Sequence, residues 1–337
     1  MQIDFYRPVG LALGSGAARG WSHIGVIRAL TEAGIEPEIV CGASAGAVVG
    51  AFYAADEFDA FERWVRNLDR RQLMALLDPT LRGGLLKARK VFDALAQHLP
   101  DRPIESLPRP FAAVATDLAS GREIWLREGS LLAALRASVA LPGLVAPEFL
   151  NSSWLVDGGL VNPVPVSLCR AMGAASVIAV DLNTTLLNRR FHADQTAVVA
   201  APSGEAPQTE PIAPDSASLE AETQDAEEKK QETGLLSSPT AARLLSSFQG
   251  VAADLLDQFG FDEGAAPSGP PTPSIYEVIT NSINIMQTRI GRSRMAGDPA
   301  ELLINPRLQD FGLLDFNRAD EAILAGRRAV AHALAAR

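Results

Sequence analysis

Short apolar runs alternate with segments of helical periodicity near the start of the chain. Residues 9–13 form an apolar run that ends at a glycine, and residues 21–33 follow with apolar side chains in helical spacing. The pattern then repeats, because the predicted strand 38–41 is followed by a tight, glycine-flanked turn and the apolar segment 45–55. Two strand–helix units in succession predict a mainly parallel sheet with helices on its faces.

The same alternation continues along most of the chain. It predicts further strands at 111–115, 123–126, 154–156, 177–180 and 301–305, and helices at 130–138, 166–172, 274–292 and 318–335. These elements place the protein in the α/β class.

The character of the sequence changes between residues 191 and 273. Pro, Ser, Ala, Glu and Gln dominate there, periodicity is lost, and few large apolar side chains remain to offset the entropy of ordering. We therefore expect a low-complexity, largely disordered insertion that divides one catalytic domain into the parts 1–190 and 274–337. Within it, residues 239–259 carry an apolar stripe that predicts an amphipathic helix. Three roles are open for this helix: docking on the domain or a partner chain, lying on a lipid surface, or standing isolated.

Composition adds expectations about the environment. With 337 residues of which 47% are apolar, the chain can bury a large core. It has no apolar stretch long enough for a membrane-spanning helix, and residues 1–8 are too polar for a signal peptide. We therefore expect a cytoplasmic protein, and a peripheral position at the inner membrane surface stays open. The two cysteines, Cys41 and Cys169, lie in apolar stretches and predict buried thiols rather than a disulfide scaffold or a zinc site.

The formal net charge of −10 bears on partners. Acidic residues crowd between positions 205 and 232, so the excess describes that segment more than the fold. The negative charge gives no support to a nucleic-acid partner, and it argues against binding to anionic lipid by electrostatic attraction alone. Any membrane contact should therefore depend on apolar or locally basic groups.

A candidate nucleophile follows the second predicted strand. The run Gly42-Ala43-Ser44-Ala45-Gly46 lies between an apolar strand and a helix, which is the setting of a nucleophile elbow. Small neighbours let such a turn tighten until the serine oxygen projects clear of the backbone, and the helix N-terminus supplies positive potential for an oxyanion. The alternative is that Ser44 simply caps an ordinary helix.

A glycine-rich loop follows the first predicted strand. Residues 14–20 read GSGAARG, and their backbone N–H groups could converge on an anion. A dinucleotide site does not fit, because the glycines fall at positions 14, 16 and 20 and Cys41, not an acidic residue, ends the next strand. The alternative is an oxyanion hole presented by one strand–helix loop to the serine of the next. Arg19 could then hold the loop or meet a lipid phosphate.

None of the four histidines is well placed to be the base for Ser44. His192 begins the predicted insertion, His332 lies in the terminal helix, and His23 stands at a helix start where a packing or hydrogen-bonding role is expected; the fourth is His98.

A carboxylate offers a better base. Asp157-Gly158-Gly159 directly follows a predicted strand, and the two glycines let this loop approach another backbone closely. The simpler interpretation of Asp157 is an ordinary turn residue.

Taken together, these motifs make the chain resemble the patatin-like phospholipases, whose signature is a glycine-rich Arg loop, Gly-x-Ser-x-Gly and Asp-Gly-Gly or Asp-Gly-Ala. The resemblance runs over residues 9–181 and resumes from residue 274, leaving the insertion uncovered. It is closest to the bacterial subgroup called RssA-like, on the strength of Trp21-Ser22-His23-Ile24-Gly25, Ala137-Ser138, Leu141-Pro142 and Asn162-Pro163.

The resemblance implies a three-layer α/β/α fold and a Ser-Asp dyad in a serine esterase that acts on lipid acyl esters without a metal or other cofactor. It makes Ser44 the nucleophile, Asp157 the base and Arg19 a support for the loop. The implied oxyanion hole comprises Gly14, Ser15, Gly16 and Ala17. Many members have four consecutive glycines here, so the backbone angles at Ser15 and Ala17 are in question. Thr116-Asp117 and Ser138 also match family positions and are interpreted as groups that fix loops.

The expected substrate is a lipid or lysophospholipid acyl ester, with possible peripheral membrane contact and a possible homo-oligomer. Two alternatives stay open. One is an α/β-hydrolase with His332 as base, and the other is a regulatory or scaffold module that has kept the fold and lost turnover.

Overall fold

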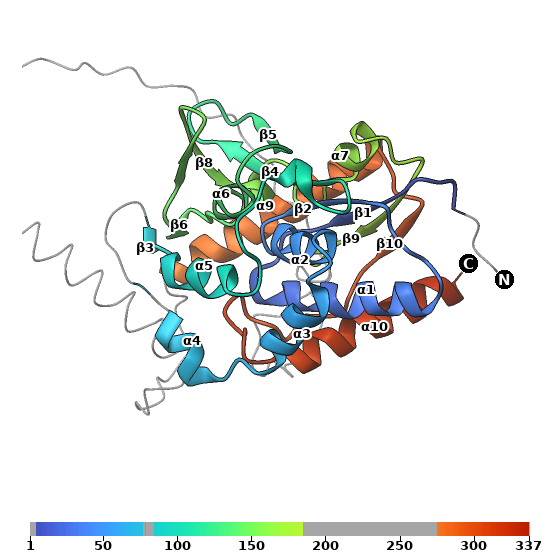
Figure 1. The fold of residues 1–337 in the computed structure, drawn as a ribbon, viewed down its shortest axis with the longest axis horizontal. Coiled ribbons are helices and arrows are strands. Elements are labelled where there is room, and N and C mark those ends of the chain that lie inside the picture. Colours follow the sequence, from blue (N-terminus) through green and yellow to red (C-terminus); the bar gives the residue numbers. More distant parts are fainter. Residues whose placement is uncertain (1–4, 77, 79–83, 185–274, 337) are drawn as a thin grey trace, which may run out of the picture. The chain divides into compact units, whose positions relative to one another are not determined.

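The computed structural model describes residues 5–76, 78, 84–184 and 275–336. Within these residues, eight strands form one sheet in the order β10-β9-β1-β2-β4-β8-β7, with β5 also paired to β4 (Figure 1). The strands are β1 Val9–Leu13, β2 Ile39–Ala43, β4 Phe111–Asp117, β5 Glu123–Leu126, β7 Glu148–Leu150, β8 Ser153–Asp157, β9 Ser176–Val180 and β10 Leu302–Ile304.

The sheet is mainly parallel, as the sequence predicts. Pairing is parallel from β10 through β9, β1 and β2 to β4, and antiparallel where β5 and β8 meet β4 and where β7 meets β8. A separate pair of short strands, β3 Gly84–Leu86 and β6 Gly143–Val145, is parallel. The carboxyl ends of β1, β2 and β4 therefore lie at one edge of the sheet, which is where ligand-binding loops of such folds gather.

The helices over the described residues are α1 Ser22–Glu32, α2 Ala45–Ala54, α3 Phe58–Arg66, α4 Arg70–Leu76, α5 Arg89–Ala96, α6 Leu131–Ser138, α7 Val166–Ala171, α9 Ile275–Gly297 and α10 Ala319–Ala335, with 3-10 turns η1 Ala17–Trp21, η2 Ile104–Ser106 and η3 Gly158–Leu160. None of them is both long enough and apolar enough to cross a membrane.

Two hydrophobic clusters make the structure three-layered. Because successive strand residues point to opposite faces, Leu11 and Leu13 of β1 join the cluster under α1, α2 and α10, whereas Ala12 joins the cluster under α7. Met295 of α9 packs against this second cluster. Helix α10 packs along α1, so the C-terminal segment and the N-terminal strands belong to one compact unit.

The predicted strands and helices are present with ends that differ by only a few residues. Helices α3, α4 and α5 lie between predicted elements and were not anticipated. The predicted insertion 191–273 and its amphipathic helix 239–259 lie outside the described residues, so that part of the domain division stays a prediction.

Candidate active site

Ser44 occupies a strained turn between β2 and α2. Its backbone angles are φ 54° and ψ −124°, a region that residues with a side chain rarely adopt. The glycines on either side make this turn possible: a Cβ atom on Gly46 would lie 2.2 Å from the carbonyl oxygen of Leu13, and one on Gly42 would lie 2.4 Å from the Cα of Ala47. The motif 42–46 therefore has the geometry of a nucleophile elbow.

Strand β4 brings Asp157 to Ser44. Ala43, the residue before Ser44, pairs with Val114 of β4, and Asp157 at the end of β8 pairs with the next residue, Ala115. As a result, Ser44 Oγ donates a hydrogen bond of 2.6 Å to Asp157 Oδ2. Both side chains are buried, with exposed fractions of 8% for Ser44 and 1% for Asp157.

Neighbouring groups fix the dyad on both sides. The N–H of Ser44 donates to Ser138 Oγ at 2.9 Å, and Thr116 Oγ1 donates to the carbonyl oxygen of Asp157 at 2.8 Å. The second carboxylate oxygen of Asp157 accepts from the N–H of Gly159 at 2.7 Å. These contacts agree with the expectation that Thr116 and Ser138 fix loops.

The glycines after Asp157 let this loop pack closely. A Cβ on Gly158 would lie 2.1 Å from the carbonyl oxygen of Val114, and one on Gly159 would lie 2.8 Å from Ser15 Oγ. The DGG loop thus touches both β4 and the glycine-rich loop.

Burial raises the pKa of Asp157 from 3.8 to about 6, and the hydrogen bonds from Ser44 and from the N–H of Gly159 offset part of this shift. The carboxylate is therefore a stronger base than an exposed aspartate, while it is still mostly ionised at neutral pH.

The glycine-rich loop differs from its expected role at two positions. The N–H of Gly14 donates to the carbonyl oxygen of Val180 at 3.0 Å, and the N–H of Ser15 donates to that of Pro163 at 2.9 Å. These two N–H groups already have backbone partners, so the prediction that they belong to an oxyanion hole is wrong for this conformation. Among the described residues, no acceptor is bonded to the N–H of Gly16 or Ala17, and these two can still serve.

The backbone angles show whether Ser15 and Ala17, which replace glycines found in many family members, adopt positive φ. Ala17 has φ 49°, in the left-handed region, whereas Ser15 is not among the described residues with positive φ. A third donor is the N–H of Ala45, which opens α2 directly after Ser44. In nucleophile elbows the residue after the nucleophile contributes to the oxyanion hole, so the motif itself contained this signal.

Arg19 supports the loop from inside the protein. It is 1% exposed, its Nε donates to the carbonyl oxygen of Gly16 at 3.1 Å, and a second guanidinium nitrogen donates to Asn284 Oδ1 of α9 at 3.1 Å. This burial favours loop support over contact with a lipid phosphate.

A buried polar network behind the loop was not anticipated. Ser15 Oγ donates to Gln287 Oε1 of α9 at 3.1 Å, and Asn183 Nδ2 donates to the carbonyl oxygen of Ser15 at 3.3 Å. No sequence motif marks Gln287 or Asn183, because these residues meet the loop only through the folded chain.

The histidines give no support to a histidine base. His23 is fully buried, its Nε2 donates to the carbonyl oxygen of Gly14 at 2.8 Å, and burial lowers its pKa to about 4. This is the hydrogen-bonding role expected for His23. His332 is exposed on α10, and His98 packs against the Trp64 ring at 5.6 Å. His192 lies outside the described residues.

Cys41 and Cys169 are both buried free thiols, as predicted, and burial raises the pKa of Cys41 well above its usual value. Within the described part of the chain, no three His, Cys, Asp or Glu side chains group together in a way that could hold a metal ion.

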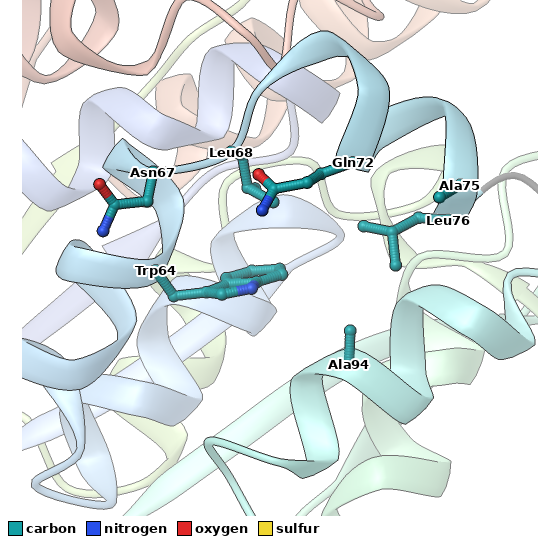
Figure 2. Close-up of a pocket in the computed structure, with 7 residues that line it drawn as sticks. All are labelled: Trp64, Asn67, Leu68, Gln72, Ala75, Leu76 and Ala94. Atoms are coloured by element: carbon teal, nitrogen blue, oxygen red, sulfur yellow. The ribbon is translucent and has the colours of Figure 1, made fainter.

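A pocket of about 250 Å³ lies between α3, α4 and α5 (Figure 2). Its lining residues are Trp64, Asn67, Leu68, Gln72, Ala75, Leu76 and Ala94. Neither Ser44 nor Asp157 lines it, so it is separate from the dyad.

Comparisons with known proteins identify a family and relatives of the chain. The family described as patatin-like phospholipase matches residues 11–170. An uncharacterized NTE family protein of Mycobacterium tuberculosis is 37% identical over 332 residues, which cover 97% of this chain and 91% of that protein. Patatin-like phospholipase domain-containing protein 6 of Mus musculus is 32% identical over 183 residues, which cover 52% of this chain and 14% of that protein.

Among solved structures, VipD from Legionella pneumophila aligns with a TM-score of 0.40 and 12% identity, over 98% of this chain and 67% of that one. This similarity is too distant to carry an argument about function.

Proposed function

The chain belongs to the patatin-like phospholipase family, and from that membership we propose that it is a serine lipid acyl hydrolase of the phospholipase A or lysophospholipase type. Ser44 is the nucleophile and Asp157 is the base. The observation that carries the proposal is the 2.6 Å hydrogen bond between the two side chains at a strained, buried turn.

In the first step, Ser44 Oγ attacks the carbonyl carbon of the acyl ester while its proton passes to Asp157 Oδ2. The carbonyl oxygen becomes an oxyanion in a tetrahedral intermediate. The bond to the leaving oxygen then breaks, and Asp157 returns the proton to that oxygen, so that an alcohol departs and the acyl group stays on Ser44.

In the second step, water attacks the acyl-serine carbonyl and gives its proton to Asp157. The fatty acid leaves as the bond to Ser44 Oγ breaks, and the proton on Asp157 returns to that oxygen. The dyad is then restored without a net change in protonation.

The oxyanion is stabilised by backbone donors. We assign this role to the N–H groups of Gly16, Ala17 and Ala45. One donor of this kind is typically worth about 3 kcal/mol of transition-state stabilisation. Because the hydrogen bond from Arg19 fixes the carbonyl group of Gly16, it helps to hold the neighbouring N–H groups in place.

The proposed substrates are acyl esters of phospholipids or lysophospholipids, met by peripheral contact with a membrane. A homo-oligomer stays a prediction.

The proposal is tested by incubating the wild-type chain and Ser44→Ala with a panel of phospholipids and lysophospholipids and measuring the released fatty acids. We expect release only from the wild type, together with labelling of Ser44 by a fluorophosphonate. If the folded wild-type chain neither releases fatty acid nor is labelled, the chain is a module that has kept the fold without turnover.

A further inference from the structure

Helix α9 buries polar side chains where a surface helix normally buries apolar ones. Thr280, Gln287 and Thr288 are buried, with exposed fractions of 8% or less. Gln287 accepts a hydrogen bond from Ser15, and Thr288 Oγ1 lies 3.3 Å from the carbonyl oxygen of Asn183. The inward side of α9 is therefore held by hydrogen bonds to the residues behind the glycine-rich loop.

The outward side of α9 is apolar over the same turns. Ile279, Ile285 and Met286 are 46%, 48% and 49% exposed. Successive residues of an α-helix are rotated by about 100°, which places Ile285 opposite Gln287 and puts Ile279 and Met286 together on the flank of the helix, about a quarter to a third of a turn from Thr280 and Gln287. The three exposed apolar side chains thus cover about a third of the circumference of the helix.

This orientation is fixed by the contacts of the inward side. Rotating α9 to bury the apolar side would break the hydrogen bonds from Ser15 to Gln287 and from Arg19 to Asn284. Each such break would remove a hydrogen bond from a buried polar group, which is costly. The exposed apolar side is therefore built into the packing of α9.

Two exposed arginines extend the outward side toward the C-terminal end of α9. Arg289 and Arg292 follow Ile285 by about one and two helical turns, and both are exposed. Over the part of the chain that the structure describes, no carboxylate forms an ion pair with either guanidinium, whereas Arg294 on the same helix pairs with Glu123. Apolar side chains beside unpaired guanidinium groups match a surface of acyl chains and anionic headgroups.

The inward side of α9 joins the helix to the loops around the dyad. Through Gln287 and Asn284, α9 is bonded to the loop that follows β1, and Ser44 follows the neighbouring strand β2 at the same edge of the sheet. Figure 1 shows α9 (orange) crossing the molecule behind α6 and ending near α7.

We propose that the outward side of α9, formed by Ile279, Ile285, Met286, Arg289 and Arg292, docks on an anionic lipid surface and so holds the chain at the membrane that contains its substrate. The role given to this contact, delivery of the enzyme to lipid, rests on the proposed hydrolase function. Binding to lipid does not require hydrolysis, so it can be measured with a variant that cannot hydrolyse the lipid.

The experiment measures binding to vesicles of equal parts phosphatidylcholine and phosphatidylglycerol, using the full chain with Ser44→Ala so that no lipid is hydrolysed. Ile285→Gln with Met286→Gln should weaken binding by at least about tenfold, because the apolar contact is lost while helix propensity is kept. Arg289→Gln with Arg292→Gln should weaken it by on the order of tenfold and remove the preference over pure phosphatidylcholine vesicles.

The matched control is Leu324→Gln, which removes a side chain of similar exposure, 46%, from α10. Its binding should equal that of the parent. Thermal unfolding checks that every variant is folded.

Three results of the binding measurement overturn the proposal: binding that the α9 variants leave unchanged, binding that Leu324→Gln weakens equally, or no vesicle binding by the parent. A change in oligomeric state on Ile285→Gln with Met286→Gln, with vesicle binding retained, would assign this side to a second copy and also overturn it. Vesicle binding through α9 in a chain that releases no fatty acid would instead contradict only the proposed hydrolase.

Discussion

The hydroxyl of Ser44 donates a 2.6 Å hydrogen bond to Oδ2 of Asp157, a residue 113 positions later in the chain. The two residues meet because consecutive positions of β4, Val114 and Ala115, pair with the end of β2 and the end of β8. The central sheet thus aligns the proposed nucleophile and base before any substrate is bound.

Replacing Asp157 with Asn should remove activity while stabilising the fold at alkaline pH. Asn is isosteric: its carbonyl oxygen can accept from the N–H of Gly159 and its Nδ2 can donate to Ser44 Oγ. It cannot accept the proton of Ser44, so hydrolysis of a soluble ester should fall by about a thousandfold. Because burial raises the pKa of Asp157 from 3.8 to about 6, ionisation opposes folding. Below pH 4 the carboxyl group of Asp157 is protonated and its burial does not lower the stability. As the pH rises through 6 the group ionises, and the free energy of unfolding falls by roughly 3 kcal/mol.

Urea unfolding of wild type and Asp157→Asn at pH 4 and pH 8 measures this effect. The free energy of unfolding of the variant should exceed that of the wild type at pH 8 and not at pH 4. An equal or smaller value at pH 8 would show that burial does not penalise the charged carboxylate.

His332→Ala should leave hydrolysis of a soluble ester within about twofold of wild type, the scale of a surface substitution away from the site. His332 is exposed on α10, and Ser44 already donates its proton toward Asp157. Steady-state rates at pH 8 provide the comparison. A loss comparable to that of Ser44→Ala would restore the α/β-hydrolase alternative with His332 as base.

Gly46→Ala should destabilise the fold and abolish activity together. The added methyl group would meet the carbonyl oxygen of Leu13 at 2.2 Å, so β1 and the elbow would have to separate. We expect a loss of at least about 2 kcal/mol in the free energy of unfolding. Gly297→Ala is the control, since nothing lies within 4 Å of its added methyl group, and it should unfold like the wild type. Equal effects of the two substitutions would argue against a close-packed elbow.

Gln287→Met should lower kcat by about tenfold with little change in KM. Ser15 Oγ donates to Gln287, and losing this acceptor should loosen the loop that carries the proposed oxyanion donors. Gln287→Glu keeps an acceptor oxygen and should retain more of kcat than Gln287→Met. If both variants change KM alone, or if Met is the milder change, Gln287 does not position the loop.

Local patterns predicted the elements of this fold well. Residues 9–13 and 45–55 differ from β1 and α2 by at most one residue, because an apolar run between glycines and a helix-initiating turn are both properties of short segments. The short helix α3 also carried a signal, since Phe58, Phe61 and Val65 share one buried face, but the pattern spans only nine residues.

The motifs pointed to Ser44 and Asp157, whereas the finer structure of the site depends on distant residues. Nothing near Gly14 or Ser15 in sequence shows that their N–H groups bond to Val180 and Pro163, since those partners come from other strands and loops. The inverted polarity of α9 is hidden for the same reason. From sequence alone, the polar residues of α9 would be assigned to its solvent-exposed side, because the loop that they contact is distant in the chain.

The most direct test of the Ser44–Asp157 dyad is the rate of covalent labelling of Ser44 by a fluorophosphonate as a function of pH. In the wild type the rate should rise about tenfold per unit below pH 6, as Asp157 loses its proton, and level off above it. In Asp157→Asn the labelling rate at pH 8 should be at least about a hundredfold lower than in the wild type, and the increase with pH below 6 should be absent. A variant that labels at the wild-type rate and keeps the same pH dependence would contradict the dyad.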